Sequence, residues 1–307
     1  MYKRSSRQLW ALAVKTGIIK SNLVPMLAGL MLALYTYNLS FVSHIIDIVL
    51  ATAGTAAVIA AAGTFNNIYD RDIDRIMPRT KTRPSVTGEI SGKTLLLAAI
   101  ALLIIGFILL YFTTPLAAVL GVLGVFFYVV PYTMWTKRRT IWNTEVGSIS
   151  GAMPPLIGWA AVAPDIWHPA CWALFAIMVI WQMPHFYAIA IRKQEDYAAA
   201  NIPMLPVVKG ERRTYVQTNF YLILLMASSA LFYPLSLGLA LVSFILSAVW
   251  LGMSIVGYHK KEVKKWERDV ELPDLETIYK LSEIYSVLAA DLLIAREKNL
   301  QLGISGI

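Results

Sequence analysis

Long apolar segments alternate with short polar stretches along the whole chain. Segments of about 20 mainly apolar residues are typical of helices that cross a lipid bilayer. The pattern predicts nine such helices, near residues 21–37, 46–68, 94–112, 115–133, 142–163, 169–191, 214–234, 237–257 and 281–295. The ninth contains Glu283 and Asp291, so it either packs against protein or lies at the membrane interface.

The composition agrees with a polytopic, all-α membrane protein. Of the 307 residues, 57% are hydrophobic and 15% are charged, whereas a soluble domain has roughly 25% charged residues. The polar stretches are short for domains, so residues 1–307 are expected to form a single membrane domain. The single cysteine, Cys171, excludes an intramolecular disulfide and does not indicate a thiolate metal site.

The net charge is +8, and the basic residues lie in every second connection between the predicted helices. Lysine and arginine gather at the N-terminus and at residues 69–93, 134–141, 192–213 and 258–280, and the intervening connections contain neither. By the positive-inside rule the basic segments are cytoplasmic, which predicts a multi-pass protein of the cell membrane with its N-terminus in the cytoplasm. The expected partners of this charge are anionic lipid or an anionic substrate, and not nucleic acid.

The stretch FNNIYDRDIDRIMPRTKTRP places acids and then bases at the end of the second predicted helix. Asn66, Asp70 and Asp74 are four residues apart, so a continuous helix keeps them within roughly 80° of one face. Two carboxylates on one face repel each other unless a cation lies between them, and oxygen ligands favour a hard ion such as Mg²⁺. The basic residues that follow supply charge for a phosphate: Arg79, Lys81 and Arg83. The stretch therefore predicts a site for magnesium diphosphate.

Asp72 lies about 200° from Asp70 on the same helix and is expected outside this site. We interpret it as a solvated acid that pairs with Arg71 or Arg75. The alternative for the whole stretch is a solvated loop whose basic residues fix topology. That alternative does not explain why an asparagine and two aspartates follow one another in steps of four.

A second polar stretch, WQMPHFYAIAIRKQEDY, ends the sixth predicted helix. On a continuous helix His185, Arg192 and Asp196 share one stripe, with Glu195 to one side. An ionisable residue within the membrane indicates function, so His185 is a candidate for proton transfer or for ligation of a haem iron. The alternatives are a hydrogen bond from His185 to a neighbouring helix and a plain ion pair between Arg192 and Asp196.

The connection before the fifth predicted helix contributes further polar groups. Lys137 and Arg138 either close over an anion or anchor the topology, and Glu145 is positioned to face a cavity. The small residues of GSISGAMPP favour close helix packing. The remaining histidines, in loops, have no grouping typical of metal ligands: His44, His168 and His259.

Four motifs in the same order make the chain similar to the UbiA superfamily of intramembrane prenyltransferases. The stretch NNIYDRDIDRIMPRTKTRP resembles its first aspartate-rich motif, N-x-x-x-D-x-x-x-D. More specifically, this stretch together with YTMWTKRRTIWNT, GAMPPLIGWAA and WQMPHFYAIAIRKQEDYAAANIPMLPV resembles the haem O synthase branch, over roughly residues 15–260.

The resemblance implies nine helices around a central cavity, with farnesyl diphosphate and haem b as substrates and haem O as product. It implies that Mg²⁺ and basic groups promote loss of diphosphate, that a haem vinyl group attacks the farnesyl group, and that water completes the substituent. Contact with a haem A synthase or a terminal oxidase assembly is a further implication. The resemblance implies that magnesium diphosphate is bound by Asn66, Asp70 and Asp74. It implies that the charge of the leaving group is neutralised by Arg79, Lys81 and Arg83, and that further diphosphate contacts come from Lys137, Arg138 and Arg192. His185 is implied on the side of the haem acceptor.

Two features depart from the family pattern. The sixth helix offers Glu195 and Asp196 instead of a full second D-x-x-x-D motif, which argues against a second metal site and favours a haem over a quinone-type acceptor. The first helix opens with KTGIIKSN where haem O synthases commonly have Lys-Pro-Arg. The alternative functions are prenyl transfer to a quinone precursor and transport of haem or lipid. Transport is disfavoured because both polar sites are expected on one membrane face.

Overall fold

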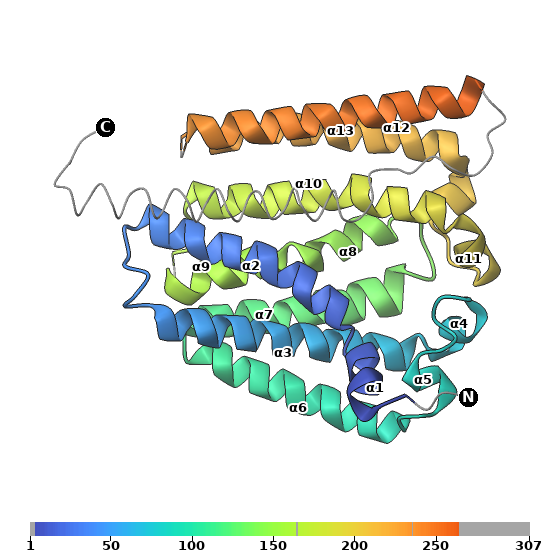
Figure 1. Ribbon diagram of the computed structural model, residues 1–307, viewed down its shortest axis with the longest axis horizontal. Coiled ribbons are helices and arrows are strands. Elements are labelled where there is room, and N and C mark those ends of the chain that lie inside the picture. Colours follow the sequence, from blue (N-terminus) through green and yellow to red (C-terminus); the bar gives the residue numbers. More distant parts are fainter. Residues whose placement is uncertain (1–3, 164, 235, 264–307) are drawn as a thin grey trace.

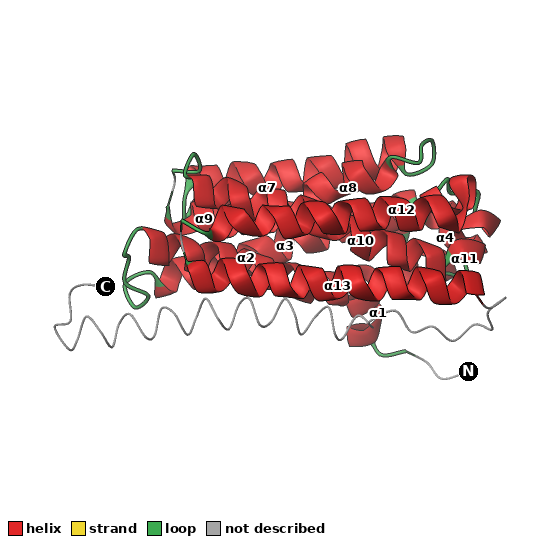
Figure 2. Cartoon of the chain, turned by 90° about the horizontal axis from the view of Figure 1, so that it is seen from above, coloured by secondary structure: helices red, strands yellow, loops and turns green. Residues whose placement is uncertain are grey.

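The computed structural model describes residues 4–163, 165–234 and 236–263, and within these residues the chain is a helical bundle without strands. The long helices lie side by side along one axis (Figures 1 and 2). In chain order the elements are α1 (Ser6–Ala13), α2 (Thr16–Thr36), α3 (Ile45–Tyr69), α4 (Arg71–Ile76), α5 (Pro84–Thr87), α6 (Gly92–Tyr111), α7 (Pro115–Phe127), η1 (Tyr128–Thr136), α8 (Asn143–Gly151), α9 (Met153–Val162), α10 (Pro169–Arg192), α11 (Gln194–Ala199), α12 (Leu205–Ser228), η2 (Ser229–Phe232) and α13 (Leu237–Val263). The predicted all-α fold is confirmed.

Within the residues that the structure describes, seven helical stretches are long and apolar enough to cross a membrane. They coincide with seven of the nine predicted segments: Thr16–Thr36, Ile45–Tyr69, Gly92–Tyr111, Pro115–Thr136, Pro169–Arg192, Leu205–Phe232 and Leu237–Tyr258. Large apolar side chains such as Leu97 and Ile104 of α6 are exposed on the outside of the bundle, as expected for contact with lipid. The ninth predicted segment, 281–295, lies outside the described residues.

The fifth predicted segment, 142–163, differs from the prediction of one continuous helix. It forms two helices, α8 and α9, which meet at Ala152 and follow one another along the bundle (Figure 1). Pro154 and Pro155 open α9. Proline has no N–H group to donate to the preceding turn, so the hydrogen-bond ladder of α8 cannot continue through them. The single-helix prediction is therefore wrong at this point.

The fourth membrane segment changes its helical form as it reaches the polar loops. After α7 the chain continues as the π-helix η1, which contains Pro131. The hydroxyl groups of Thr133 and Thr136 donate to the carbonyl oxygens of Tyr128 and Pro131, each at 2.8 Å. π-helical turns are rare and frequently occur at functional sites. Here η1 leads directly into the basic connection that begins at Lys137.

Glycines allow α2 and α9 to pack in direct backbone contact. A Cβ atom at Gly29 would lie 2.1 Å from the carbonyl oxygen of Pro155, and one at Gly158 would lie 1.9 Å from that of Met26. At Gly151 a Cβ atom would meet the Gln182 side chain at 1.9 Å. The predicted packing role of GSISGAMPP is thus confirmed, since these distances leave no room for a side chain.

The short helices α1, α4, α5 and α11 gather at one end of the bundle, which we call the polar end (Figure 1). Ile73 and Met77 pack there against Ala190, Ile202 and Met204. This apolar cluster joins the segment after α3 to the segment after α10. The two polar stretches singled out in the sequence are consequently neighbours in space.

Candidate active site at the polar end of the bundle

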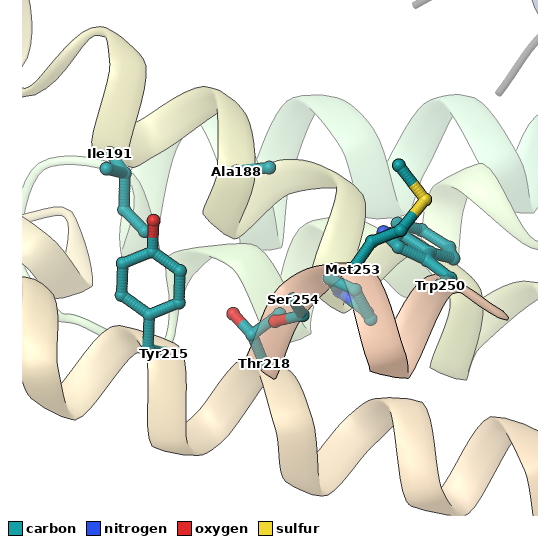
Figure 3. A pocket seen from close by; sticks show the side chains of 8 residues that line it. Ala188, Ile191, Tyr215, Thr218, Trp250, Met253 and Ser254 are labelled. Atoms are coloured by element: carbon teal, nitrogen blue, oxygen red, sulfur yellow. The ribbon is translucent and has the colours of Figure 1, made fainter. Parts of the chain in front are cut away.

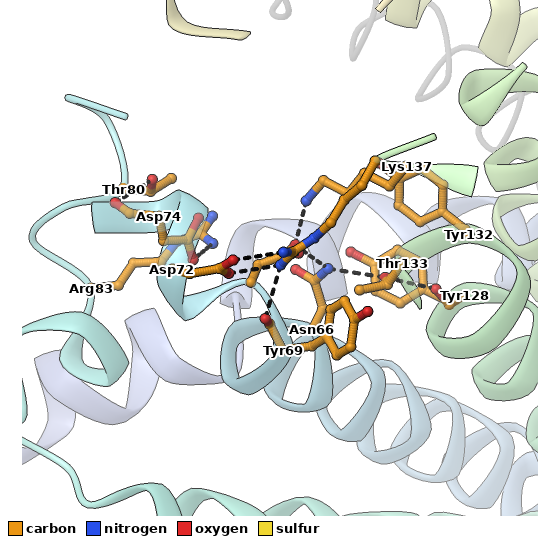
Figure 4. A network of polar contacts seen from close by, with 12 residues as sticks. Asn66, Tyr69, Asp72, Asp74, Thr80, Arg83, Tyr128, Tyr132, Thr133 and Lys137 are labelled. Atoms are coloured by element: carbon orange, nitrogen blue, oxygen red, sulfur yellow. Dashed lines mark hydrogen bonds and ion pairs between the residues drawn. The ribbon is translucent and has the colours of Figure 1, made fainter. Parts of the chain in front are cut away.

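The last turn of α3 carries Asn66 and Asp70 into the protein interior, where their exposed fractions are 3% and 0%. Asn66 Nδ2 donates to Asp70 Oδ2 at 2.7 Å and to Thr133 Oγ1 at 3.0 Å (Figure 4). Although α3 ends at Tyr69, the Asp70 N–H donates to Asn66 O and the Asp74 N–H donates to Asp70 O, each at 2.8 Å. The predicted four-residue step is thus preserved across a break at Asp70.

Basic side chains from the connection after η1 reach Asp70. Lys137 Nζ donates to Asp70 Oδ2, and Arg138 Nη2 lies 3.4 Å from Asp70 Oδ1. The Arg138 guanidinium also rests over the Tyr69 ring, with 4.8 Å between its Cζ atom and the ring centroid. Both residues therefore contact the site, in addition to any contribution to topology.

Asp72 lies outside this interior group, as predicted, but its partner differs from the prediction. Arg138 donates to both Asp72 carboxylate oxygens, at 2.6 and 2.7 Å. The predicted pairing with Arg71 or Arg75 is wrong, because the fold brings the guanidinium group of a residue 66 positions away onto the carboxylate. These hydrogen bonds hold the pKa of the Asp72 carboxyl group below its ordinary value.

Asp74 is the second interior carboxylate, with an exposed fraction of 2%. Arg83 Nη1 donates to Asp74 Oδ2 at 2.6 Å, and Thr80 Oγ1 donates to the Asp74 carbonyl oxygen at 3.0 Å. Of the predicted basic residues in this loop, Arg83 thus reaches the site. Arg79 and Lys81 are exposed on the same loop.

Lys15 is a member of the site that the sequence pattern did not reveal. It donates its Nζ hydrogen to Asn66 Oδ1 from a left-handed backbone conformation with φ of 57°, at the start of α2. Gly63 lies beside it, where a Cβ atom would come 3.4 Å from Lys15 Cδ. Burial and the neighbouring charges of Arg83 and Lys137 lower the pKa of Lys15 well below its ordinary value. In the sequence, Lys15 is a basic residue directly before an apolar helix, and such a position predicts only the orientation of the helix in the membrane.

These contacts define what we call the aspartate cluster: Lys15, Asn66, Asp70, Asp72, Asp74, Arg83, Lys137 and Arg138. It contains three carboxylates and four basic side chains, of which Lys15, with its lowered pKa, contributes the least positive charge. A cluster of this charge is complementary to a metal-bound diphosphate, which is negative overall. Within the protein itself, Lys137 and Arg83 balance the charge of the buried carboxylates of Asp70 and Asp74.

The oxygen atoms of Asn66, Asp70 and Asp74 are the group that fits a metal ion. Among the described residues, no group of three or more histidine, cysteine, aspartate or glutamate side chains is arranged so that it could hold a metal ion by itself. A hard ion such as Mg²⁺ needs one or two carboxylates and completes its shell with water and phosphate oxygens. Asp70 and Asp74, which now accept hydrogen bonds from Lys137 and Arg83, are the two carboxylates that would hold such an ion and supply its charge neutralisation.

The second predicted stretch does not form one helical stripe. α10 ends at Arg192, Lys193 has φ of −112° and ψ of 24°, and α11 begins at Gln194. Because this break redirects the chain after Arg192, the predicted alignment of Asp196 with His185 and Arg192 is wrong, whereas His185 and Arg192 both lie on α10 as predicted. Arg192 and Glu195 are exposed, whereas Asp196 is half-buried.

His185 lies inside the bundle on α10. Its ring stacks on Trp181, with 5.1 Å between centroids and an interplanar angle of 11°, and it meets the Phe186 ring edge-on at 5.3 Å. Its Nδ1 atom is buried and has no hydrogen-bond partner within the described chain. The alternative interpretation, a hydrogen bond from His185 to a neighbouring helix, therefore finds no support at Nδ1 among the described residues.

Glu145 faces inward from the first turn of α8, as the sequence suggested. The Tyr187 hydroxyl of α10 donates to Glu145 Oε1, and Gln217 Nε2 of α12 donates to the same oxygen at 3.0 Å. Gln217 Nε2 also lies 2.9 Å from the Tyr187 hydroxyl oxygen. Three helices thus contribute to one polar group, which we call the Glu145 triad.

A separate small pocket lies between α10, α12 and α13 (Figure 3). Its lining is largely apolar and comprises Pro184, Ala188, Ile191, Tyr215, Thr218, Trp250, Met253 and Ser254. The hydroxyl groups of Thr218 and Ser254 donate to Thr214 O and Asn219 Oδ1. Since it includes no residue of the aspartate cluster, this pocket is not the site predicted from the sequence.

Comparison with known proteins gives concordant matches over most of the chain. The model of the UbiA prenyltransferase family matches residues 22–272. Among curated proteins, the chain is 63% identical over 265 residues to Protoheme IX farnesyltransferase 2 of Lysinibacillus sphaericus, covering 86% of this chain and 84% of that protein. It is 59% identical over 268 residues to Protoheme IX farnesyltransferase 1 of Bacillus cytotoxicus, covering 87% and 88%.

Solved structures share the same fold at low sequence identity. A UbiA homolog from Archaeoglobus fulgidus bound to DMAPP and Mg²⁺ superposes with a TM-score of 0.69 at 17% identity, covering 91% of this chain and 96% of that one. A UbiA homolog from Aeropyrum pernix K1 superposes with a TM-score of 0.67 at 18% identity, covering 90% and 98%.

Proposed function

The chain belongs to the UbiA prenyltransferase family, and from this membership we propose that it is a haem b farnesyltransferase that produces haem O. As a prenyltransferase, it transfers an isoprenoid group from a diphosphate ester. We propose farnesyl diphosphate as the donor and a vinyl group of haem b as the acceptor. The relatives named protoheme IX farnesyltransferase, at 63% and 59% identity, support this choice over a quinone precursor.

The observation that carries the proposal is the aspartate cluster at the polar end. Asp70 and Asp74 are buried and pair with Lys137 and Arg83, whereas a solvated loop that served topology alone would leave these charges in water, because burying a charge is costly. In the proposed function Lys15, Arg83 and Lys137 bind the diphosphate and stabilise the charge that develops as the C1–O bond breaks. Arg138 lies at the edge of the site, where its hydrogen bonds to Asp72 fix its position. The exposed Arg79, Lys81 and Arg192 remain candidates for diphosphate contacts once substrate is bound.

Mg²⁺ is the proposed metal, held by Asn66, Asp70 and Asp74. The UbiA homolog from Archaeoglobus fulgidus, which shares the fold, is bound to Mg²⁺ together with DMAPP or GPP, and this supports the choice. The ion would supply charge neutralisation of the leaving diphosphate. Glu195 and Asp196 are proposed as a weaker second acidic group, since they stand at the same end of the bundle without a complete aspartate-rich motif.

On the acceptor side we propose that His185 contacts haem b. Its buried, unpartnered Nδ1 atom is available for an axial ligand bond or for proton transfer. The flat aromatic neighbours Trp181 and Phe186 suit a planar macrocycle.

We further propose that residues 1–307 act as one domain of the cell membrane, with the polar end in the cytoplasm. The basic residues of the N-terminus and of the loops at 69–93 and 134–141 support this orientation. A haem A synthase or an oxidase assembly would then be the natural recipient of the product.

The test is to incubate membranes that contain the full chain with haem b, farnesyl diphosphate and Mg²⁺, and to measure haem O by mass spectrometry. Asp70→Asn is expected to lower the rate by about 100-fold or more, because a neutral amide binds the metal-diphosphate poorly. Asp47→Asn, the same substitution at the opposite end of α3, is the matched control and should retain activity. Absence of haem O from the unmodified protein, or full activity of Asp70→Asn, would contradict the proposal.

A further inference from the structure

The Glu145 triad leaves one carboxylate oxygen unused. Tyr187 and Gln217 both donate to Oε1. Oε2 is buried and has no hydrogen-bond partner among the described residues. A buried polar atom without a partner costs free energy, so its persistence indicates a ligand.

A packing role does not account for this arrangement. Tyr187 is fully buried, and its hydroxyl group is oriented by contacts with both Glu145 and Gln217. Two donors on the same oxygen fix the carboxyl plane and direct Oε2 away from the partners. A glutamine at 145 would fill the same volume without burying an acid.

The triad stands close to the aspartate cluster through η1. The Tyr132 ring of η1 packs against α8 so closely that a Cβ atom at Gly147 would lie 2.9 Å from Tyr132 Cδ2. The next residue, Thr133, accepts the hydrogen bond from Asn66. Figure 4 shows Tyr132 beside Lys137, on the side of the cluster toward η1. Neighbouring residues of η1 therefore contact both α8 and the aspartate cluster.

We propose that Glu145 is the base that accepts the proton in the last step of the reaction, an inference that rests on the proposed haem farnesyltransferase function. The C1–O bond of farnesyl diphosphate breaks and its electron pair leaves with the diphosphate. The vinyl π pair forms the new C–C bond between the terminal vinyl carbon and C1. This leaves a cation at the inner vinyl carbon, which a water oxygen captures. One O–H proton of that water passes to Glu145 Oε2, and no oxidant or reductant is required.

Tyr187 and Gln217 are positioning residues in this scheme. Their hydrogen bonds hold Oε1 and so aim Oε2 at the captured water. General-base catalysis by a positioned side chain contributes roughly 100-fold or more to rate. Loss of one positioning hydrogen bond is expected to lower turnover less than loss of the carboxylate.

The experiment compares Glu145→Gln with the unmodified full chain in membranes supplied with haem b, farnesyl diphosphate and Mg²⁺. Haem O formation is expected to fall by about 100-fold. Binding of farnesyl diphosphate should be unchanged, and a farnesylated haem lighter than haem O by one water should appear. Glu89→Gln, an exposed acid that pairs with Arg4, is the control and should match the unmodified protein.

Two further variants separate a chemical from a structural role. Glu145→Asp keeps a base and is expected to restore part of the haem O yield. Tyr187→Phe is expected to lower turnover of haem O while leaving the KM for farnesyl diphosphate unchanged.

Haem O formation by Glu145→Gln within about threefold of the unmodified rate would overturn the proposal, since general-base catalysis contributes far more. Parallel loss of farnesyl diphosphate binding in Glu145→Gln and Glu145→Asp would also overturn it, because that result indicates misfolding. Failure of the unmodified protein to make haem O would instead reject the proposed function.

Discussion

At the scale of single residues, Lys15 is the basic group that enters the aspartate cluster from the N-terminal side. Its positive φ is uncommon for a residue with a side chain, and its amine contacts Asn66. Lys15→Met keeps the length of the side chain and removes the charge, so we expect kcat/KM for farnesyl diphosphate to fall by about 100-fold. Steady-state kinetics of diphosphate release measures this. Lys20→Met, at an exposed position of α2, is the control, and an equal loss in both variants would contradict a specific role for Lys15.

Asp72 and Asp74 provide a matched comparison within one motif. Asp74 is buried and pairs with Arg83. Asp72 pairs with Arg138, and its side chain is 63% exposed. An exposed ion pair contributes about 1 kcal/mol or less, so Asp72→Asn should leave thermal stability and haem O formation near the unmodified values. Asp74→Asn should abolish activity, because it removes a proposed metal ligand. Mass-spectrometric assay of both variants decides the matter, and equal losses would show that activity requires Asp72 as much as Asp74.

Spacing along one helix is enough to predict that Asn66, Asp70 and Asp74 turn toward the same side, and all three are buried in the structure. Contacts that join distant segments are a different matter, because no local pattern encodes them. Lys15 and Asn66 are 51 residues apart, and Lys137 and Asp70 are 67 residues apart. The same limit explains why the partner of Asp72 was predicted among its immediate neighbours and is instead Arg138.

At the scale of elements, the π-helix η1 determines where the basic connection meets α3. A π-turn accommodates one more residue than an α-turn, so its loss would rotate the following residues by about 100°. Pro131→Ala restores the N–H group and favours a regular helix. We expect this to move Lys137 and Thr133 away from the cluster and to lower kcat by about 10-fold or more.

Thermal unfolding in detergent is the companion measurement for Pro131→Ala, and it should show equal or higher stability, because removal of an internal proline improves the helix. Lower activity with retained stability supports a positioning role for η1. Unchanged kcat would show that Lys137 does not depend on the π-turn.

Hydropathy predicts the long helices well because a bilayer demands a long apolar run, as for Pro169–Arg192 against the predicted 169–191. It does not resolve interruptions within an apolar run. The α8–α9 junction and the π-turn both depend on prolines, Pro154 and Pro131, whose effect is on backbone hydrogen bonds and not on apolar character.

At the scale of the whole molecule, the short helices α1, α4, α5 and α11 gather at the polar end of the bundle (Figure 1), where the aspartate cluster lies. Large apolar side chains are exposed along the long helices. α3, η1, α8, α10 and α12 each contribute at least one polar side chain to the cluster or to the Glu145 triad. Ion pairs join the chain after α3 to the connection after η1, through Asp70 and Asp72 with Lys137 and Arg138. The fold therefore does not depend on a bound ligand to balance its buried carboxylates.

This internal balance predicts that metal removal stops catalysis without unfolding the protein. In the metal-free state Lys137 and Arg83 occupy Asp70 and Asp74, so chelation with EDTA should leave the unfolding temperature in detergent nearly unchanged. Haem O formation should stop and should return on addition of Mg²⁺. With Mg²⁺ present, farnesyl diphosphate at 100 times its Kd should stabilise the folded state by about 2.7 kcal/mol, and without metal by much less. Unfolding on chelation alone would mean that the metal, and not the basic side chains, balances the buried carboxylates.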